Sequence, residues 1–300
     1  MNGPLHSIRL NGITANLLIL ELGNGTTHPT TLCKGQPMFY QANSIRLAYD
    51  DEGSGLPLVF LHAFPLNRSM WKPQVTALST QFRTIAVDLR GHGESDAPLW
   101  SFSLEQYADD VAALLDHLNI PQAVLVGLSM GGYVSLAFSR RYGNRLRALV
   151  LADTRAQADS PEGRTGRFHL AQTAYTQGAE AVANTMLPKL LGTTSLKSKP
   201  ELVESIRRTI QHTPVSGMLV DLMAMAARPD SVAHLKAISC PTFVVVGEED
   251  HTTPLADAQL MARELPKARL AVIPAAGHVS NCEQPETFND LLRGFVEELA

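Results

Sequence analysis

Residues 123–138 of the chain read AVLVGLSMGGYVSLAF and combine three local signals. The first four residues are continuously apolar, which is typical of a strand that is covered on both faces of a parallel sheet. Apolar residues at helical spacing follow from residue 133 to residue 138. Between them, residues 127–131 form a G-x-S-x-G pattern, which in a strand–turn–helix setting holds a serine nucleophile at the carboxyl end of a sheet. The stretch therefore predicts that Ser129 is a nucleophile at a strained turn.

Seven further runs rich in β-forming residues lie on both sides of this stretch, with helical periods between them. Together with residues 123–126 they predict an α/β fold with a mostly parallel, doubly wound sheet of eight strands. The short links between the first strands also allow antiparallel pairing at that edge. The seven runs are residues 38–41, 45–49, 56–62, 84–87, 148–152, 242–246 and 269–273.

The chain between the sixth and seventh predicted strands has a different pattern, because helical periods follow one another there without a β-rich run. We expect residues 155–237 to form a helical cap, or lid, on a core domain made of residues 36–154 and 238–300. Residues 1–35, which are rich in Gly, Thr and Asn, are expected to be a poorly ordered N-terminal extension. The helical periods of the cap are residues 162–175, 179–191, 200–212 and 215–227.

Composition and charge exclude several classes of protein. The 300 residues are 45% hydrophobic and 18% charged, which argues against disordered chains and disulfide scaffolds. A formal net charge of −4 offers no basic field, so we expect no nucleic-acid partner and no membrane partner. No stretch approaches the ~20 apolar residues of a membrane-spanning helix, and Cys33, Cys240 and Cys282 show no metal-ligand spacing. We expect a cytoplasmic protein without a metal that acts on a small organic molecule.

A serine nucleophile needs a base, and the base needs an orienting acid. His278 follows the last predicted strand in a loop of small residues, so it is the candidate base. Asp250 lies just beyond the strand at 242–246 and is the preferred acid, while Asp153, beyond the strand at 148–152, is the alternative. The order Ser129, Asp250, His278 is the order typical of a serine nucleophile at such a strand–helix turn.

An acyl-transfer site also needs donors for the developing oxyanion. The backbone N–H of Met130, directly after the nucleophile, is one candidate donor. The second is the N–H of Phe64, in the loop that follows the third predicted strand. The candidates for the lining of a substrate pocket between sheet and cap are four apolar side chains, Trp71, Met186, Leu219 and Met223.

These landmarks together resemble those of the α/β-hydrolase-fold family, from about residue 38 to residue 300. Within the family the chain is most similar to small carboxylesterases, 3-oxoadipate enol-lactonases and cofactor-free haloperoxidase-like perhydrolases. Ala63 departs from the H-G pair of many members, and its added methyl group is expected to shift the oxyanion loop slightly. Besides the G-x-S-x-G turn, the resemblance rests on residues 62–66 (HAFPL), 88–95 (DLRGHGES), 153–155 (DTR), 160–164 (SPEGR), 247–250 (GEED) and 277–278 (GH).

The resemblance implies a serine hydrolase that cleaves small carboxylic esters without a cofactor. In such an enzyme Ser129 would attack the carbonyl carbon, His278 would take its proton and Asp250 would hold the imidazolium. A lactonase, or a perhydrolase in which hydrogen peroxide replaces water, stays an alternative because the same triad serves all three reactions. A non-catalytic ligand-binding protein on this fold is the alternative from another class. An apolar face of the cap would also allow a homodimer.

Residues 91–93, GHG, contain a G-x-G pair of the kind found in dinucleotide-binding loops. The third glycine of that fingerprint is absent, because Asp96 stands in its place. We therefore interpret this segment as a structural turn at the end of the fourth predicted strand.

Overall fold

The computed structural model describes residues 7–10, 13–16, 38–97 and 103–299. The chain divides into two compact units, residues 1–36 and residues 37–300. In the first unit, strands β1 (Ser7–Leu10) and β2 (Ile13–Asn16) pair in antiparallel fashion. The rest of the predicted N-terminal extension, which covers residues 1–35, lies outside the described residues.

The second unit is built on an eight-stranded sheet, as the sequence predicts. Its strands are β3 (Met38–Ala42), β4 (Ile45–Glu52), β5 (Pro57–Leu61), β6 (Arg83–Val87), β7 (Ala123–Leu128), β8 (Leu146–Ala152), β9 (Thr242–Gly247) and β10 (Ala268–Ile273). They lie in the order β10-β9-β8-β7-β5-β6-β4-β3, in which only the pairs β3–β4 and β4–β6 are antiparallel. All six residues of β7 and of β9 are buried, which explains their unbroken apolar sequences.

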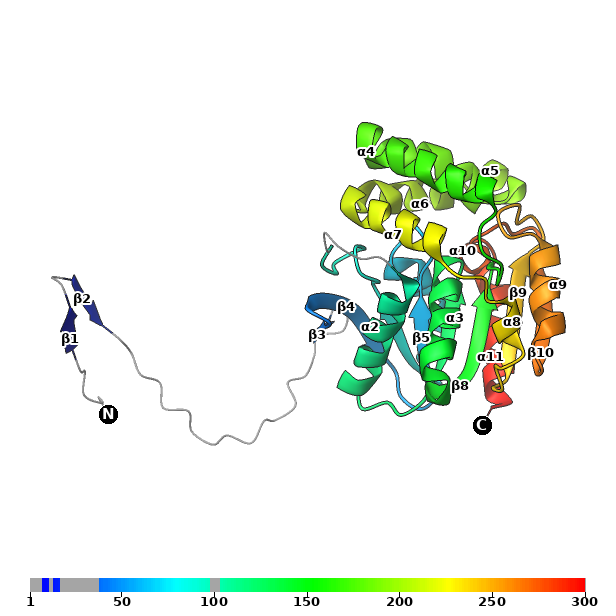
Figure 1. Cartoon of the computed structure of the whole chain (residues 1–300). Coiled ribbons are helices and arrows are strands. Elements are labelled where there is room, and N and C mark those ends of the chain that lie inside the picture. Colours follow the sequence, from blue (N-terminus) through cyan, green and yellow to red (C-terminus); the bar gives the residue numbers. More distant parts are fainter. Residues whose placement is uncertain (1–6, 11–12, 17–37, 98–102, 300) are drawn as a thin grey trace. The chain divides into compact units, whose positions relative to one another are not determined.

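Helices pack against both faces of the sheet. Outside the cap they are η1 (Arg68–Trp71), α1 (Lys72–Leu78), α2 (Leu104–His117), α3 (Met130–Tyr142), η2 (Gly143–Arg145), α8 (Val232–Leu235), α9 (Leu255–Glu264), α10 (Ser280–Glu283) and α11 (Pro285–Glu297). Helices α2 and α3 lie against one face, and α1 and α11 lie against the other (Figure 1). Trp71 fills the core on the second face, where its ring contacts Phe60 and Phe288.

Between β8 and α8 the chain forms four helices, which we call the cap: α4 (Pro161–Leu190), α5 (Thr193–Ser198), α6 (Pro200–His212) and α7 (Val215–Ala227). They lie beyond the carboxyl ends of the parallel strands (Figure 1). The bounds of α6 and α7 are those that the sequence predicts. The helices expected at 162–175 and 179–191 are the two halves of α4, which is kinked at Gly178 by a φ of 79°. In the ranges that the structure describes, no helix is both long and apolar enough to span a bilayer.

Candidate active site

Ser129 lies at the turn between β7 and α3, at the edge of the sheet where the parallel strands end. Its backbone has φ 53° and ψ −110°, a strained conformation that persists only where the surrounding structure holds it. A Cβ atom on Gly127 would lie 2.3 Å from the carbonyl oxygen of Gly131, and one on Gly131 would lie 2.1 Å from that of Leu61. Glycine at both positions therefore lets the strand and the helix come close enough to form the turn.

The structure brings Ser129, His278 and Asp250 into one hydrogen-bonded chain. Nε2 of His278 lies 2.7 Å from Oγ of Ser129, and Nδ1 of His278 lies 2.8 Å from Oδ2 of Asp250. All three residues are nearly excluded from solvent, with exposed fractions of 9% for Ser129, 2% for His278 and 3% for Asp250. The arrangement lets the imidazole accept the serine proton while its other nitrogen donates to the carboxylate.

The loop after β9 supplies further donors to the carboxylate of Asp250. Oδ1 accepts hydrogen bonds from the N–H groups of Thr252 and Thr253, and Oδ2 accepts one from the Thr253 hydroxyl at 2.7 Å. Burial acts to raise the pKa of Asp250, but His278 and these donors lower it below its usual value. Burial acts to lower the pKa of His278, but Asp250 raises it above its usual value. The site thus favours an ionised carboxylate beside a basic imidazole.

The two expected oxyanion donors lie in the segments that follow β5 and β7, at the same edge of the sheet as Ser129. Met130 is the first residue of α3, so its N–H belongs to the helix N-terminus, where amides lack intrahelical partners and the helix dipole favours negative charge. Phe64 lies in the turn after β5, the strand that pairs with β7, and it is buried. Both amides therefore come from chain segments that begin beside the nucleophile.

Buried side chains hold the loop that carries Phe64. Nε2 of His62 accepts a hydrogen bond from the N–H of Leu89 at 3.0 Å, so Nδ1 carries the proton and donates to the carbonyl of Ala63 at 3.0 Å. Burial lowers the pKa of His62 well below its usual value, which keeps the ring neutral. The N–H of Ala63 in turn donates to Sδ of Met70 at 3.3 Å. The methyl group of Ala63 is fully buried, so the core accommodates the departure from glycine at this position.

Asp153, the alternative acid, is bonded to groups other than His278. Its Oδ1 accepts a hydrogen bond from the N–H of Gly247 at 2.8 Å. Its Oδ2 accepts two from Ser280, one from the N–H at 3.1 Å and one from the hydroxyl at 2.6 Å. The side chains within hydrogen-bond distance of Nδ1 of His278 are those of Asp250 and Thr253.

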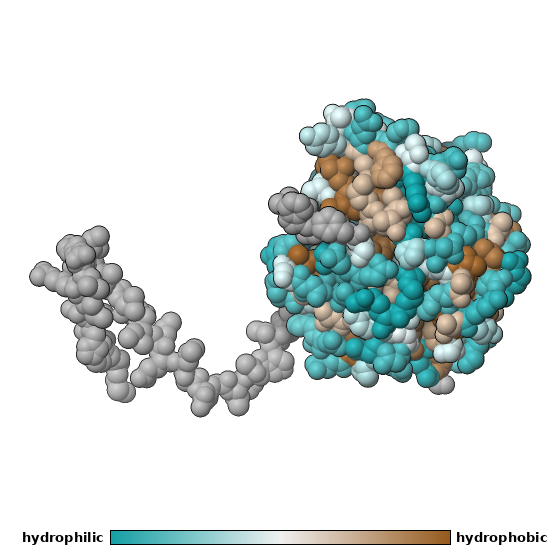
Figure 2. Space-filling view, viewed as in Figure 1, coloured by the Kyte–Doolittle hydropathy of each residue, from teal (hydrophilic) through white to brown (hydrophobic). Residues whose placement is uncertain are grey.

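The four apolar side chains expected to line a substrate pocket lie in different surroundings. Trp71 is fully buried among the aromatic rings of the core, so packing accounts for it. Met186 of α4 and Leu219 of α7 are half-buried against the core. Met223 of α7 is 36% exposed, and Figure 2 shows apolar side chains on the surface of the cap. The sequence pattern alone does not show which of these apolar side chains are fully buried, half-buried or exposed.

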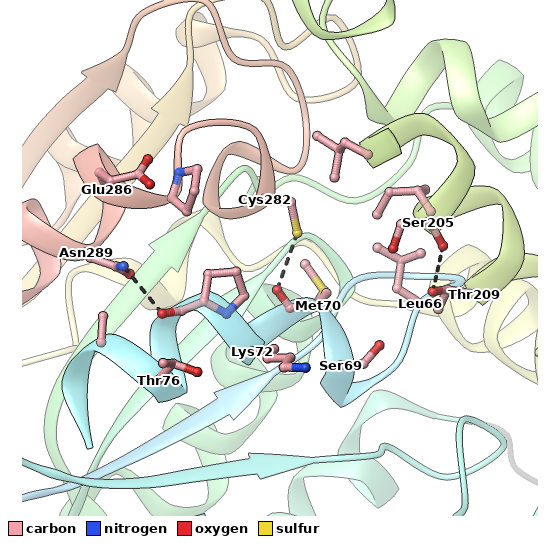
Figure 3. A pocket seen from close by; sticks show the side chains of 15 residues that line it. Leu66, Ser69, Met70, Lys72, Thr76, Ser205, Thr209, Cys282, Glu286 and Asn289 are labelled. Carbon is pink, nitrogen blue, oxygen red and sulfur yellow. Dashed lines mark hydrogen bonds between the residues drawn. The ribbon is translucent and has the colours of Figure 1, made fainter. Parts of the chain in front are cut away.

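A cleft of about 530 Å³ opens between the core and the cap (Figure 3). Its lining comes from η1, α1, α6, α10 and α11, and neither Ser129 nor His278 is part of it. Leu66 and Cys282 do line it, and they belong to the segments that follow Phe64 and His278 in the chain. The cleft therefore adjoins the candidate site from the side of α1 and α11. No periodicity in the sequence indicates it, because its lining comes from separate elements.

The sequence profile of the alpha/beta hydrolase fold matches residues 57–285. The chain belongs to this family. An esterase from Thermogutta terrifontis is 41% identical to this alpha/beta hydrolase, with a TM-score of 0.85 over 88% of this chain and 99% of the esterase.

Two enol-lactonases are also similar to this alpha/beta hydrolase. The enol-lactonase from Burkholderia xenovorans is 31% identical, with a TM-score of 0.81 over 87% of this chain and 100% of its own. A 3-oxoadipate enol-lactonase from Acinetobacter baylyi is 32% identical over 240 residues, which cover 80% of this chain and 88% of that protein. The predicted family and fold class are therefore confirmed.

In this alpha/beta hydrolase, residues 189–194 of the cap are hydrogen-bonded to the loops that carry Asp250 and His278, and we call this the corner contact. The N–H of His278 donates to the carbonyl of Leu190 at 3.0 Å. The hydroxyl of Thr252 donates to the carbonyl of Lys189 at 2.8 Å. The cap is thus attached directly to both of these loops.

Glu283 of α10 joins the two sides of the corner contact. Its Oε2 accepts a hydrogen bond from the N–H of Gly192 in the cap, and its Oε1 accepts one from the N–H of Gly277, both at 2.8 Å. The side chain is fully buried, and burial raises its pKa above the usual value. Sequence reasoning missed Glu283, because a glutamate in a polar stretch near a helix start usually faces solvent.

A second contact, which we call the α7 contact, joins residues 213–221 to the core near the oxyanion loop. The hydroxyl of Thr213 donates to the carbonyl of Pro65 at 2.9 Å. Asp221 of α7 is fully buried, and its carboxylate is hydrogen-bonded to Nε2 of His92 and to the hydroxyl of Tyr107. Burial acts to lower the pKa of His92, but Asp221 raises it above its usual value.

The GHG turn at residues 91–93 also belongs to the α7 contact. Gly91 has a φ of 84°, and a Cβ atom on it would lie 2.8 Å from Cα of Gly217. The turn and helix α7 therefore meet backbone to backbone. The placement is consistent with the interpretation of this segment as a structural turn, and it adds a contact with the cap that the sequence does not indicate.

Proposed function

We propose that this alpha/beta hydrolase is a serine hydrolase of small carboxylic esters, with Ser129 as nucleophile, His278 as general base and Asp250 as orienting acid. The observation that carries the proposal is the hydrogen-bonded chain from Oγ of Ser129 through both nitrogens of His278 to Oδ2 of Asp250, with distances of 2.7 Å and 2.8 Å. Such a chain activates a hydroxyl, because an acceptor for its proton is already aligned.

In the first half of the reaction, Oγ of Ser129 attacks the carbonyl carbon of the ester while Nε2 of His278 takes its proton. The N–H groups of Phe64 and Met130 donate to the carbonyl oxygen as it gains negative charge, and Asp250 stabilises the imidazolium. His278 then gives the proton to the leaving alcohol oxygen as the C–O bond breaks, which leaves an acyl-enzyme.

In the second half, a water molecule gives a proton to His278 and adds to the acyl carbonyl carbon. The bond to Oγ of Ser129 breaks, Ser129 recovers its proton from His278, and the carboxylic acid leaves. Neither half requires a cofactor, because proton transfer and charge stabilisation come from the side chains and the backbone.

The substrate class is proposed from burial and from the relatives together. The near-complete burial of the three side chains favours a small substrate. The Thermogutta esterase is 41% identical to this chain, whereas the two enol-lactonases are 31% and 32% identical. The higher identity to the esterase favours an acyclic ester as the substrate. Lactone hydrolysis is the second candidate that these relatives favour, because ring opening follows the same attack with a tethered leaving oxygen.

The test is a series of 4-nitrophenyl esters, from acetate to dodecanoate, with the wild type, S129A and S139A. We expect turnover to be highest with short acyl chains, and S129A to lose at least about 10³-fold in kcat. Ser139 is the matched control, since it is a buried serine of α3, the helix that begins directly after Ser129, and its hydroxyl donates to the carbonyl of Leu136. We expect S139A to keep wild-type turnover. Equal turnover by S129A and the wild type would contradict the proposal.

The same proteins distinguish the remaining candidates. Opening of a lactone by the wild type, without turnover of any ester in the series, would favour a lactonase. Bromination that requires both acetate and hydrogen peroxide would favour a perhydrolase. Binding of an ester or lactone without any turnover would favour a non-catalytic binding protein.

A further inference from the structure

The carboxyl group of Asp153 lies at the junction of the loops of Asp250 and His278, although the proposed acyl transfer does not use it. Gly247, which donates to its Oδ1, is three residues before Asp250 in the chain. Ser280, which donates twice to its Oδ2, is two residues after His278. Asp153 itself directly follows β8. Its side chain therefore bridges the loop of the proposed acid and the loop of the proposed base.

This bridge is made by a carboxyl group in an unfavourable place for a charge. Asp153 is fully buried, and its three donors are neutral backbone and hydroxyl groups. Burial, followed by the charge of Asp250, raises the pKa of Asp153 to about 7. A neutral side chain would cost less to bury, so hydrogen bonding alone does not account for an aspartate here. Among the described residues, Asp250 and Arg155 act on the pKa of His278 together with Asp153, while Cys282 lies near Asp153 and Glu283 is bonded to the N–H of Gly277.

We propose that Asp153 is a positioning residue for the general base: its carboxylate ties the two loops together, and its negative charge helps His278 to accept a proton. The proposal rests on the proposed function in taking His278 as the base. The negative charges of Asp250 and Asp153 both raise the pKa of His278, whereas the positive charge of Arg155 lowers it. Removing the charge at position 153 should therefore lower the pKa of His278.

The contribution of Asp153 depends on its own ionisation. With a pKa of about 7, the carboxyl group is mostly charged above neutral pH and mostly protonated below it. Protonation of His278 in turn favours the charged form of Asp153, so the two groups titrate as a coupled pair. The charge is therefore present at the pH where a hydrolase of this kind needs a basic histidine.

The test is the titration of His278 in the wild type, in D153N and in S280A. NMR of protein labelled with ¹³C-histidine follows the imidazole, whose signal is identified by its loss in H278Q. We expect the midpoint to fall by about one pH unit in D153N, which removes the charge. We expect a clearly smaller fall in S280A, which keeps the carboxyl group of Asp153 but removes the Ser280 hydroxyl, a hydrogen-bond donor that lowers the pKa of Asp153. An unchanged midpoint in folded D153N, or an equal fall in both variants, overturns the proposal.

Activity separates this proposal from the proposed function. With 4-nitrophenyl acetate, we expect the acidic limb of kcat/KM to move in D153N by the same amount as the NMR midpoint. We expect kcat at pH 8 to fall about threefold or more, because a less basic imidazole is a weaker general base. A fall in kcat without a shift of the limb indicates a merely structural residue and overturns the proposal. If the wild type does not cleave the ester, the proposed function fails, while the NMR titration still decides the role of Asp153.

The wild-type chain provides a second test that does not depend on the folding of D153N. Protein labelled with ¹³C at the aspartate carboxyl groups reports the ionisation of Asp153 beside that of His278. We expect both groups to show two coupled steps over the same pH range. Independent single-step curves for the two groups overturn the proposal.

Discussion

The corner contact and the α7 contact both join the cap helices to the core, but they hold different parts of the candidate site. The corner contact consists of a backbone hydrogen bond, a hydrogen bond from the Thr252 hydroxyl and the bonds of the Glu283 carboxylate, and it reaches the loops of Asp250 and His278. The α7 contact reaches Pro65, the neighbour of Phe64, and includes a buried pair of titratable side chains. The cap is therefore attached separately to the proposed proton-transfer groups and to the proposed oxyanion loop.

The two contacts also differ in their response to pH. Asp221 raises the pKa of His92 above its usual value, against the effect of burial. A group with a raised pKa in the folded state contributes stability that is fully present below its unfolded pKa and is lost as the pH rises through its folded pKa. We therefore expect the α7 contact to be strongest in mildly acidic solution. The titratable group of the corner contact is a carboxyl group, that of Glu283, and burial raises its pKa.

The substitution D221N tests the α7 contact and has the largest expected effect. The asparagine oxygen still accepts from Tyr107, and its NH₂ group donates to a neutral His92, but the variant has no charge to balance a protonated His92. We expect the free energy of unfolding to fall by about 3 kcal/mol at pH 6 and by less than about 1 kcal/mol at pH 9. Urea unfolding at the two pH values measures both changes.

The matched control for D221N is D110N. Asp110 is also buried, but its partner is Arg90, with both oxygen–nitrogen distances at 2.8 Å, and a guanidinium stays charged at both pH values. We expect D110N to lose stability at pH 6 and at pH 9 alike. If D221N also lost the same free energy at both values, titration of His92 would not govern the strength of the α7 contact.

The substitution E283Q tests the corner contact. Glutamine has one side-chain oxygen where glutamate has two, so the N–H of Gly192 or of Gly277 would face an NH₂ group. We expect the loop of His278 to shift and kcat for the ester to fall about tenfold, with little change in KM, because a displaced base costs rate more than binding. Steady-state kinetics with 4-nitrophenyl acetate measure the two constants.

The control for E283Q is E249Q. Glu249 directly precedes Asp250 in the chain and contacts the cap at Thr194. Glu249 accepts a hydrogen bond from the N–H of Thr194 at 2.9 Å, but it is only half-buried, so water can replace the lost acceptor. We expect E249Q to keep kcat within about twofold of the wild type. Wild-type kcat in E283Q, together with lower stability, would reduce the corner contact to a structural role.

The sheet could be predicted from the sequence because each strand's pattern depends on its own burial. The apolar run at 123–126 falls in β7, whose residues are all buried, and helices α6 and α7 begin and end where their periods do. Helix α5 could not be predicted in this way. It is six residues long, and the acceptor for the N–H of Thr194 in its first turn is Glu249, which lies 55 positions away in the chain. A short helix that depends on such a distant partner leaves no local period.

The residues of the candidate site that directly follow a strand could be predicted from the sequence. Ser129, Asp250 and His278 each follow a parallel strand, and the carboxyl ends of parallel strands meet at one edge of a sheet. Glu283 and Asp221 could not be found by this argument. They lie within helices, and their partners Gly192 and His92 are 91 and 129 positions away. A polar residue in a helix has the same local pattern whether it faces solvent or a buried partner.

The substitution T213V has the smallest expected effect. It tests whether the hydrogen bond from Thr213 to Pro65 aligns the oxyanion loop. Valine keeps the shape of threonine but cannot donate to the carbonyl of Pro65, so we expect a loss of about 1 kcal/mol in unfolding free energy. We expect kcat/KM for 4-nitrophenyl acetate to fall about threefold. When the loop relaxes, Phe64 moves together with its neighbour Pro65, and its N–H is less well aligned with the oxyanion. Unlike the effect of D221N, this loss should be equal at pH 6 and pH 9, since no titrating group is changed. Wild-type kcat/KM in T213V, with the expected loss of stability, would mean that the α7 contact holds the cap without aligning the oxyanion donors.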